Sequence, residues 1–184
     1  MVSTVIKNWD KENWLSSRNY ILNFNNFVIK VNKLNVNSQI LDIGCGRGKI
    51  MGSLSSTLKL KYKPIGIDLV SHKDKDRRIN FRKIDALSFF SNNKIKFDLI
   101  LVKQTIHLLK MREIKNLLIK MKKSLKPKGK ILIFTLDPNK NEIPNFKLMN
   151  VKLSESLKRD KKIIKFISKF YPKREIKFFS YKVN

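Results

Sequence analysis

Residues 40–49 of the chain are Ile40-Leu41-Asp42-Ile43-Gly44-Cys45-Gly46-Arg47-Gly48-Lys49. A short β-branched run contains an acidic residue near its end, three closely spaced glycines follow, and a helical pattern begins after them. Glycines in such a turn let the backbone pass close to a ligand without a Cβ in the way, and the start of a helix offers N–H groups that lack helical partners. The run therefore predicts a strand–turn–helix unit that holds a small polar ligand.

A nicotinamide dinucleotide is not the expected ligand of this turn. The dinucleotide-binding fingerprint needs a third glycine at the position that Lys49 occupies. It also has no need of an acid two residues before the first glycine, where Asp42 stands. These two departures disfavour an NAD-dependent dehydrogenase.

The chain on both sides of this unit alternates short apolar runs with helical spacing. We expect strands over five runs, namely Gln39 to Ile43, Pro64 to Asp68, Ile79 to Ile84, Phe97 to Val102 and Lys130 to Leu136. Helical spacing covers Arg47 to Leu60 and Met111 to Leu125. Runs that are apolar on both faces are typical of parallel strands covered by helices. The alternation predicts a three-layer, doubly wound, mostly parallel α/β sheet.

Length and composition bound the number of domains and the compartment. The 184 residues fit one domain, with an N-terminal helical extension over 1–37, a core over 38–136 and a final helix and strand over 137–184. Cys45 is the only cysteine, which excludes an internal disulfide and a cysteine-based zinc cluster and favours the reducing cytoplasm. No apolar run approaches the ~18 residues that span a bilayer, so no membrane partner is expected.

The chain is strongly basic, with 41 Lys plus Arg against 14 Asp plus Glu and a formal net charge of +27. Such a charge would attract a polyanion. Lys, Ile and Asn are all abundant, however, and all three have AT-rich codons. Genome composition therefore explains much of the lysine excess, and the charge alone does not establish a nucleic-acid partner.

Further motifs follow the glycine turn in a fixed order. They are Ile65-Gly66-Ile67-Asp68-Leu69, Lys83-Ile84-Asp85-Ala86-Leu87, Phe97-Asp98-Leu99-Ile100-Leu101-Val102 and Leu125-Lys126-Pro127-Lys128-Gly129. Together with residues 42–48 they resemble the class I S-adenosylmethionine-dependent methyltransferases. The resemblance extends from residue 38 to residue 136, which makes this segment the expected cofactor-binding core.

The resemblance implies S-adenosylmethionine as the cofactor and assigns roles to matching residues. The glycine loop would pass under the methionine part with the support of Asp42, Asp68 would accept the ribose hydroxyls, and Asp85 would meet the adenine amino group. The full set of expected cofactor-binding residues is Asp42, Gly44, Cys45, Gly46, Asp68, Leu69, Asp85, Ala86 and Lys103. The sulfonium is itself a strong electrophile, so alignment and exclusion of water suffice for direct displacement of the methyl group.

Three residues, Asp98, His107 and Cys45, each have a structural and a chemical interpretation. Asp98, at the start of a strand, is expected to be a turn or cap residue rather than a ligand contact. His107 follows strand four, where a histidine suits a general base but is often structural in this family. Cys45 lacks the basic partner that a nucleophilic thiolate needs, so we expect it only to line the loop.

The acceptor is harder to derive. The Asn/Asp-Pro-Pro-Tyr/Phe motif of many amino-group methyltransferases is missing. The run Ile106-His107-Leu108-Leu109 and the Leu-Lys-Pro-x-Gly turn resemble those of small-molecule enzymes, with Trp14, Tyr20 and Gln104 as candidate substrate contacts. The short stretch after Leu69 is similar to ribosomal RNA ribose methyltransferases, which makes RNA the alternative acceptor. A third possibility is a cofactor-binding subunit without an acceptor site.

The end of the chain departs from the family pattern. The family sheet has two strands after strand five, whereas we find only Glu175 to Val183, preceded by a basic amphipathic helix over Val151 to Phe170 on the acceptor side. We therefore expect either a sheet that lacks its last strand or a chain shortened at its C-terminus. An exposed sheet edge would favour an oligomer or a partner chain there.

Overall fold

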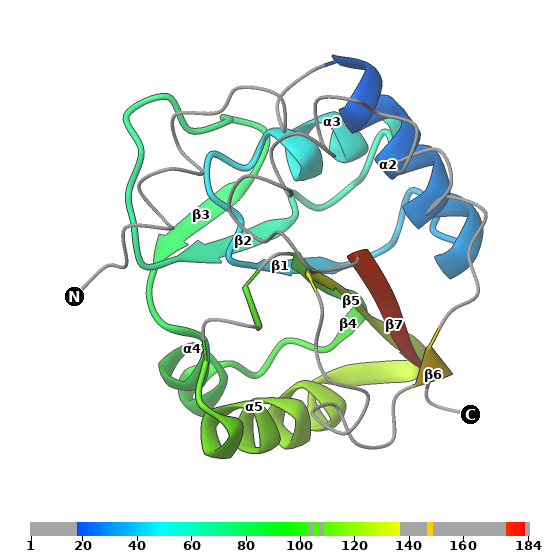
Figure 1. The fold of residues 1–184 in the computed structure, drawn as a ribbon. Coiled ribbons are helices and arrows are strands. Elements are labelled where there is room, and N and C mark those ends of the chain that lie inside the picture. The colour runs from blue at the N-terminus through cyan, green and yellow to red at the C-terminus, as the bar shows by residue number, and fades with distance from the viewer. Residues whose placement is uncertain (1–17, 104, 107–108, 137–146, 149–175, 183–184) are drawn as a thin grey trace.

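The computed structural model describes residues 18–103, 105–106, 109–136, 147–148 and 176–182. Its centre is a seven-stranded sheet with the order β3-β2-β1-β4-β5-β7-β6 (Figure 1). The strands are β1 (Ile40–Ile43), β2 (Ile65–Asp68), β3 (Asn80–Lys83), β4 (Phe97–Lys103), β5 (Leu125–Leu136), β6 (Lys147–Leu148) and β7 (Ile176–Lys182). The first five strands pair in parallel, and β7 runs antiparallel to both β5 and β6. This order confirms the predicted doubly wound class.

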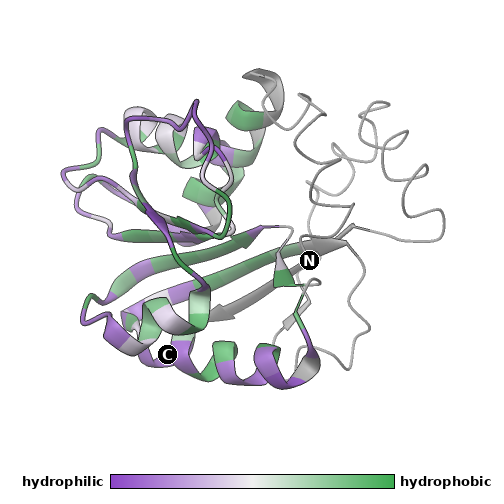
Figure 2. Ribbon diagram, turned by 90° about the vertical axis from the view of Figure 1, so that its left-hand side faces the viewer, coloured by the Kyte–Doolittle hydropathy of each residue, from purple (hydrophilic) through white to green (hydrophobic). Residues whose placement is uncertain are grey.

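Helices cover both faces of the sheet. They are α2 (Arg18–Asn32), α3 (Lys49–Leu58), α4 (Ala86–Asn92) and α5 (Met111–Lys123). One core cluster joins residues of α2 and α3 to one face of the strands, and a second cluster joins α4 and α5 to the other face. Figure 2 shows the hydrophobic strands lying between helices that carry hydrophilic residues on their outer sides. The chain therefore has the three expected layers.

Alternation along β1 explains why two cores form. Leu41 and Ile43 contribute to the cluster with α4 and α5, whereas Ile40 contributes to the cluster with α2 and α3. Successive side chains of a strand point to opposite faces, so Asp42 shares the face of Ile40. Asp42 is thus a charged residue placed in the α2–α3 layer, at the carboxyl end of a strand that is buried throughout.

Helix boundaries differ from the predicted ones where the backbone turns left-handed. Gly48 adopts φ 71° and Lys59 adopts φ 49°, so α3 is confined to the residues between them, although the apolar spacing predicted a start at Arg47 and an end at Leu60. The sequence analysis did not predict α4, which spans only seven residues and is therefore too short to show a periodic pattern. No helix forms between β2 and β3, as the short connection predicted.

The sheet has both of the strands expected after β5, so the prediction of a missing last strand is wrong for this fold. β6 is only two residues long and pairs with β7 through Lys147 opposite Ser180 and Leu148 opposite Phe179. A strand of two residues leaves no alternation in the sequence, which is why only the later one was predicted. The expected helix over Val151 to Phe170 lies outside the described residues.

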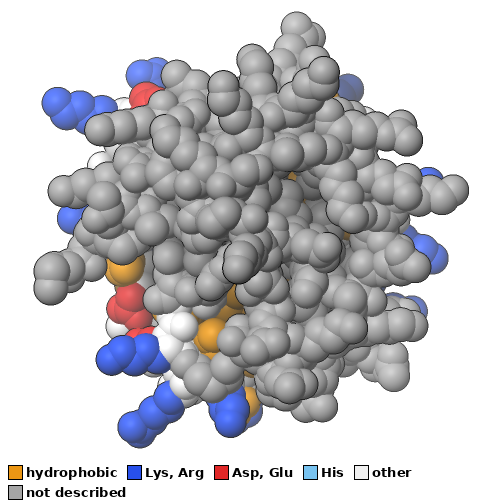
Figure 3. Space-filling view, in the orientation of Figure 1, with side chains coloured by type: hydrophobic (Ala, Val, Ile, Leu, Met, Phe, Trp, Pro, Cys, Tyr) orange, Lys and Arg blue, Asp and Glu red, His pale blue; other side chains and the backbone are white. Residues whose placement is uncertain are grey.

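Within the described part of the chain, no helix is long and apolar enough to cross a membrane. In Figure 3, Lys and Arg side chains project around the rim of the molecule, with few acidic side chains beside them. The N-terminal extension contributes α2, whose residues Phe24 and Val28 are almost fully buried against the sheet. This helix packs against α3 and helps to close one layer of the core.

Candidate functional site

The glycine turn between β1 and α3 requires a left-handed backbone at two positions that face different surroundings. Gly44 adopts φ +73°, and a Cβ added there would collide with the side chain of Thr105. Gly46 adopts φ +54°, and a Cβ added there would meet no atom within 4 Å. The backbone at Gly44 is therefore covered by protein, whereas the backbone at Gly46 faces open space that a ligand can approach.

Hydrogen bonds tie this turn to the end of β2. The N–H groups of Gly44 and Cys45 both donate to the carbonyl oxygen of Ile67, at 2.8 and 3.1 Å. The Gly46 N–H donates to one carboxylate oxygen of Asp68 at 2.8 Å, and the Val70 N–H donates to the other at 2.9 Å. The Asp68 carboxylate is therefore held in place beside the glycine turn.

Asp42 and Lys103 form a charged pair at the carboxyl ends of β1 and β4. In the register of the sheet Asp42 lies opposite Leu101, so Lys103 follows two residues later on the same face. Only 4% of Asp42 is exposed, and its Oδ1 has no hydrogen-bond partner among the residues that the structure describes. Such an oxygen is a candidate contact for a cationic or hydrogen-bonding group of a ligand.

Burial changes the titration of both members of this pair. Loss of hydration raises the pKa of Asp42 to about 7, against the opposing attraction of Lys103 and with a smaller contribution from nearby Asp68. Loss of hydration also lowers the pKa of Lys103 to about 8, which the negative charge of Asp42 partly opposes. Two carboxylates and one ammonium therefore lie close to the glycine turn.

The thiol of Cys45 is not activated. Burial raises its pKa far above the ordinary value, and the negative charges of Asp42 and Asp68 raise it further. Because the thiolate is the nucleophilic form, the geometry agrees with the expectation that Cys45 only lines the loop. A Cβ added at Gly66 of β2 would lie only 2.8 Å from the Sγ of Cys45, so the thiol occupies the space above this glycine.

The remaining expected cofactor residues occupy the same edge of the sheet. Leu69 directly follows β2 and is 63% exposed, which is unusual for a large apolar side chain. Asp85 ends the β3 segment and accepts a hydrogen bond from the Ser88 N–H at 2.9 Å, which caps α4 and helps to lower the pKa of this carboxyl. Ala86 is the first residue of α4. Asp85 therefore has a structural role in the fold.

Thr105 is a residue of this site that the sequence analysis missed. Its hydroxyl lies 3.0 Å from the Lys103 carbonyl oxygen and 3.3 Å from the Ile43 carbonyl oxygen, which links the ends of β4 and β1. The side chain also covers Gly44. Its position just after strand four was the only signal in the sequence.

Asp98 lies at the opposite edge of the sheet, as its expected structural role requires. Its carboxylate accepts a hydrogen bond from the Gln39 N–H and pairs with Lys126, both at 2.7 Å.

Four other candidates cannot be placed by their side chains. His107, Gln104 and Trp14 lie outside the described residues, and Tyr20 is described only as part of the α2 backbone.

Comparison with known proteins defines the class of this chain. Residues 40–129 match the family model described as a methyltransferase domain. These residues contain all five motifs of the predicted series, including the glycine turn and both strand-end carboxylates. This segment is therefore similar to a methyltransferase domain, and the predicted resemblance to S-adenosylmethionine-dependent methyltransferases is confirmed.

Solved structures agree with this class at the level of the fold. The plantazolicin methyltransferase BpumL in complex with SAH is 19% identical to this chain and has a TM-score of 0.64. The match covers 99% of this chain and 92% of that protein. A Burkholderia thailandensis 1,6-didemethyltoxoflavin-N1-methyltransferase with S-adenosylhomocysteine is 12% identical, with coverages of 98% and 85% and a TM-score of 0.63. Among curated proteins, none matches this sequence.

A third structure is much longer than this chain. The Haemonchus contortus phosphoethanolamine N-methyltransferase 2 in complex with S-adenosyl-L-methionine is 18% identical with a TM-score of 0.65. The match covers 94% of this chain but only 55% of that protein, so the chain spans about half the length of this relative. The cofactor expected from the sequence is the one that these structures contain, as substrate or product.

Proposed function

We propose that this chain binds S-adenosylmethionine at the carboxyl edge of the sheet and transfers its methyl group to a small-molecule acceptor. The observation that supports this most directly is the meeting of three features in one place. The open backbone at Gly46, the fixed carboxylate of Asp68 and the orphaned oxygen of Asp42 all lie where β1 and β2 end. These features fit a ligand with a diol at one end and an ammonium at the other.

Each residue has a proposed role in holding the cofactor. Asp68 accepts the ribose hydroxyls, because two backbone N–H groups already fix the orientation of its carboxylate. Leu69 offers its exposed side chain to the adenine ring, beside Asp85 and Ala86. Asp42 and Lys103 bind the two charged groups of the methionine part. The Asp42 carboxylate attracts the ammonium of the ligand, and the Lys103 ammonium attracts its carboxylate.

The sulfonium supplies the electrophilic methyl group, and this chain supplies alignment and a dry site. An acceptor lone pair attacks the methyl carbon in line with the breaking carbon–sulfur bond, the electron pair of that bond returns to sulfur, and the acceptor proton is lost to solvent. His107 remains a prediction for a general base. Trp14, Tyr20 and Gln104 remain predictions for acceptor contacts.

We propose a small molecule over RNA as the acceptor. Eight of the described lysines lie at or near the amino ends of the strands, so this lysine-rich edge does not surround the transferred methyl group. The structural neighbours named above act on plantazolicin analogues or didemethyltoxoflavin, and a nitrogen acceptor in a small molecule or peptide is the corresponding proposal here. We further propose that the chain forms a single domain and that it acts in the cytoplasm.

Calorimetric titration with S-adenosylhomocysteine tests the cofactor site. We expect saturable binding by the wild-type chain and at least a tenfold loss for Asp68→Ala, since hydrogen bonds to a charged group contribute about 1.5–3 kcal/mol. The matched control is Asp98→Ala, which removes a carboxylate at the other edge and should leave the affinity unchanged. Equal losses for both variants would contradict the proposed site.

Transfer of labelled methyl groups tests the activity separately. Incubation of the chain with a small-molecule fraction and an RNA fraction of a cell extract should give labelled product in the first fraction only. Product in the RNA fraction would favour the alternative acceptor. Cofactor binding without any product would favour a cofactor-binding subunit.

A further inference from the structure

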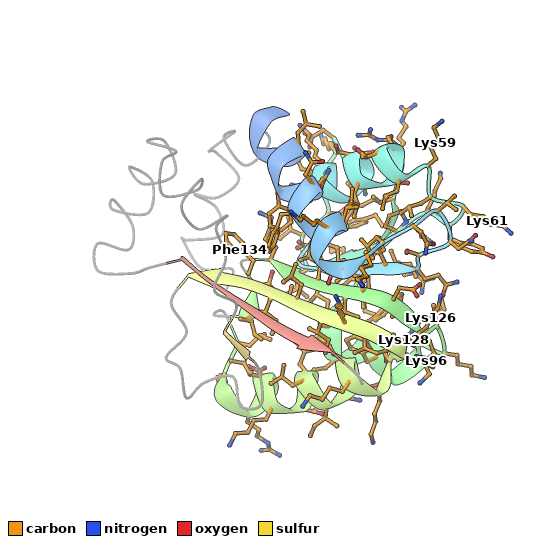
Figure 4. All side chains as sticks on the ribbon, turned by 90° about the vertical axis from the view of Figure 1, so that its right-hand side faces the viewer. Lys59, Lys61, Lys96, Lys126, Lys128 and Phe134 are labelled. Carbon is orange, nitrogen blue, oxygen red and sulfur yellow. The ribbon has the colours of Figure 1, made fainter. Side chains whose placement is uncertain are left out.

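Lysines cluster on the connections that lead from helices into strands. Because β1, β2, β4 and β5 run in parallel, the segments that precede them all lie at the amino edge of the sheet. Figure 4 shows side chains from three of these connections projecting from that edge of the molecule. The lysines of these segments are Lys33, Lys59, Lys61, Lys63, Lys94 and Lys96, and the first residues of β5 add Lys126 and Lys128. They define the amino-edge lysine cluster.

Acids are unevenly distributed between the two edges, although the carboxyl edge also carries cations such as Arg47, Lys49 and Lys73. None of the connections that carry the cluster contains Asp or Glu. Among the described residues, the acid nearest to them is Asp98, at the start of β4, and Lys126 already pairs with it. The opposite edge holds most of the described acids, including Asp42, Asp68 and Asp85. AT-rich codons add lysine to every face, but they do not remove acids from one edge, so codon usage does not explain this uneven distribution.

A half-open cavity of about 540 Å³ lies within the cluster. Half of its lining is apolar, from isoleucine and phenylalanine side chains, and the other half consists of Lys61, Lys63, Arg82, Tyr62, Asn80 and Gln39. Tyr62 is 46% exposed, and the ammonium of Lys61 lies 5.7 Å from the centroid of its ring. The cavity lies at the amino ends of the strands, so it is separate from the proposed cofactor site at their carboxyl ends.

We propose that this edge binds single-stranded nucleic acid, with phosphates on the lysines and a base against Tyr62. Such binding combines a basic track for the backbone with aromatic side chains on which bases stack. A bilayer surface does not fill a cavity set between charged loops. An acidic peptide could pair its carboxylates with the lysines, but it has no base to stack on Tyr62. The site is distinct from methyl transfer, so it places the enzyme beside RNA without making RNA the acceptor.

Fluorescence anisotropy with a labelled oligouridylate measures this binding on the full chain. If about five lysines contact phosphates, the logarithm of the affinity should fall with the logarithm of salt concentration with a slope of roughly −3.5. The variant Lys61→Glu/Lys128→Glu should bind about tenfold or more weakly and with a shallower slope. Both side chains are exposed, so a thermal melt should show an intact fold.

The matched control reverses two exposed charges on α5, Arg112→Glu and Lys115→Glu. It lowers the formal charge of +27 by the same amount as the edge variant. We expect the control to retain most of the wild-type affinity. Equal losses in the two variants would mean that net charge alone attracts the oligonucleotide, and the proposed site would be wrong.

Substitution of Tyr62 separates stacking from charge. Tyr62→Ala should weaken oligouridylate binding about tenfold, while Tyr62→Phe keeps a ring and should keep the affinity. Anionic phospholipid vesicles and polyglutamate serve as competitors at equal charge. Stronger binding of either competitor at this edge, or no oligouridylate binding at low salt, would overturn the proposal. Retained binding of S-adenosylhomocysteine by the Tyr62→Ala variant would show that the two sites are independent.

Discussion

The two edges of the sheet use the same parallel strands in opposite ways. At the carboxyl edge, the strands end in Asp42, Asp68 and Lys103, and backbone N–H groups of the glycine turn hold one of these carboxylates in place. At the amino edge, exposed lysines dominate, and the one acid near them is already paired. Among the described residues, only the carboxyl edge combines a buried carboxylate with a glycine turn whose backbone is open to a ligand, which is typical of a site that positions a ligand.

The difference shows where chemical function resides in this fold. A buried charge destabilises a chain, so a carboxylate such as Asp42 is expected to persist there only if it is used. Exposed lysines impose little such cost and depend on number rather than on geometry. Changes at the carboxyl edge should therefore alter stability and ligand affinity strongly, whereas a change of any single lysine at the amino edge should have a small effect.

The largest expected effect comes from Gly44→Ala. The added Cβ would collide with Thr105 in a backbone conformation that disfavours side chains, so the free energy of unfolding should fall by about 3 kcal/mol. Gly46→Ala is the matched control, because its Cβ meets open space. It should cost only about 1 kcal/mol of stability yet still weaken S-adenosylhomocysteine binding. Urea unfolding and calorimetry measure the two quantities, and unchanged affinity in Gly46→Ala would contradict an approach of the cofactor to this backbone.

The next effect concerns pH and Asp42. Because the pKa of Asp42 is about 7 in the folded chain and 3.8 as its ordinary value, folding takes up a proton between these values. Its contribution should therefore make the folded state progressively less stable as the pH rises from about 4 to about 7. Asp42→Asn should flatten this slope in urea unfolding between pH 4.5 and 7.5. A slope that persists in the variant would assign the titration to another group.

Asp85 gives a smaller effect in which two roles can be separated. Asp85→Ala removes the cap of α4 and should cost about 1 kcal/mol, while Asp85→Asn keeps an oxygen for the Ser88 N–H and should retain the stability. Both variants lack the charged acceptor proposed for the adenine amino group. We therefore expect weaker S-adenosylhomocysteine binding in both, and a thermal melt that separates them. Full affinity in Asp85→Asn would leave Asp85 with a structural role only.

The smallest effect is expected from Asp98→Asn at the amino edge. The ion pair with Lys126 is about one third exposed on both sides, so its loss should cost less than about 1 kcal/mol. Binding of S-adenosylhomocysteine should not change, and binding of oligouridylate should strengthen slightly, because Lys126 loses its partner. A clear loss of cofactor affinity in this variant would show that the two edges are coupled.

Residues 40–49 and the alternation of apolar runs around them allowed most of the fold to be predicted from the sequence. Five strands showed apolar runs long enough to recognise, and the glycine spacing located the turn at Gly46. The elements missed were those with too few residues for a period, α4 and β6. The role of Thr105 depends on a contact between strands that local sequence does not encode. The acceptor contacts remain predictions, because they depend on segments outside the described residues.

The buried thiol in the glycine turn has a practical consequence for labelling. Since Cys45 is the only cysteine and its pKa is raised far above neutrality, little thiolate is present near pH 7. A maleimide dye should therefore react with a cysteine introduced at an exposed position, such as Asn37, in preference to the native thiol. Spectroscopic probes can thus be attached to an otherwise unaltered molecule.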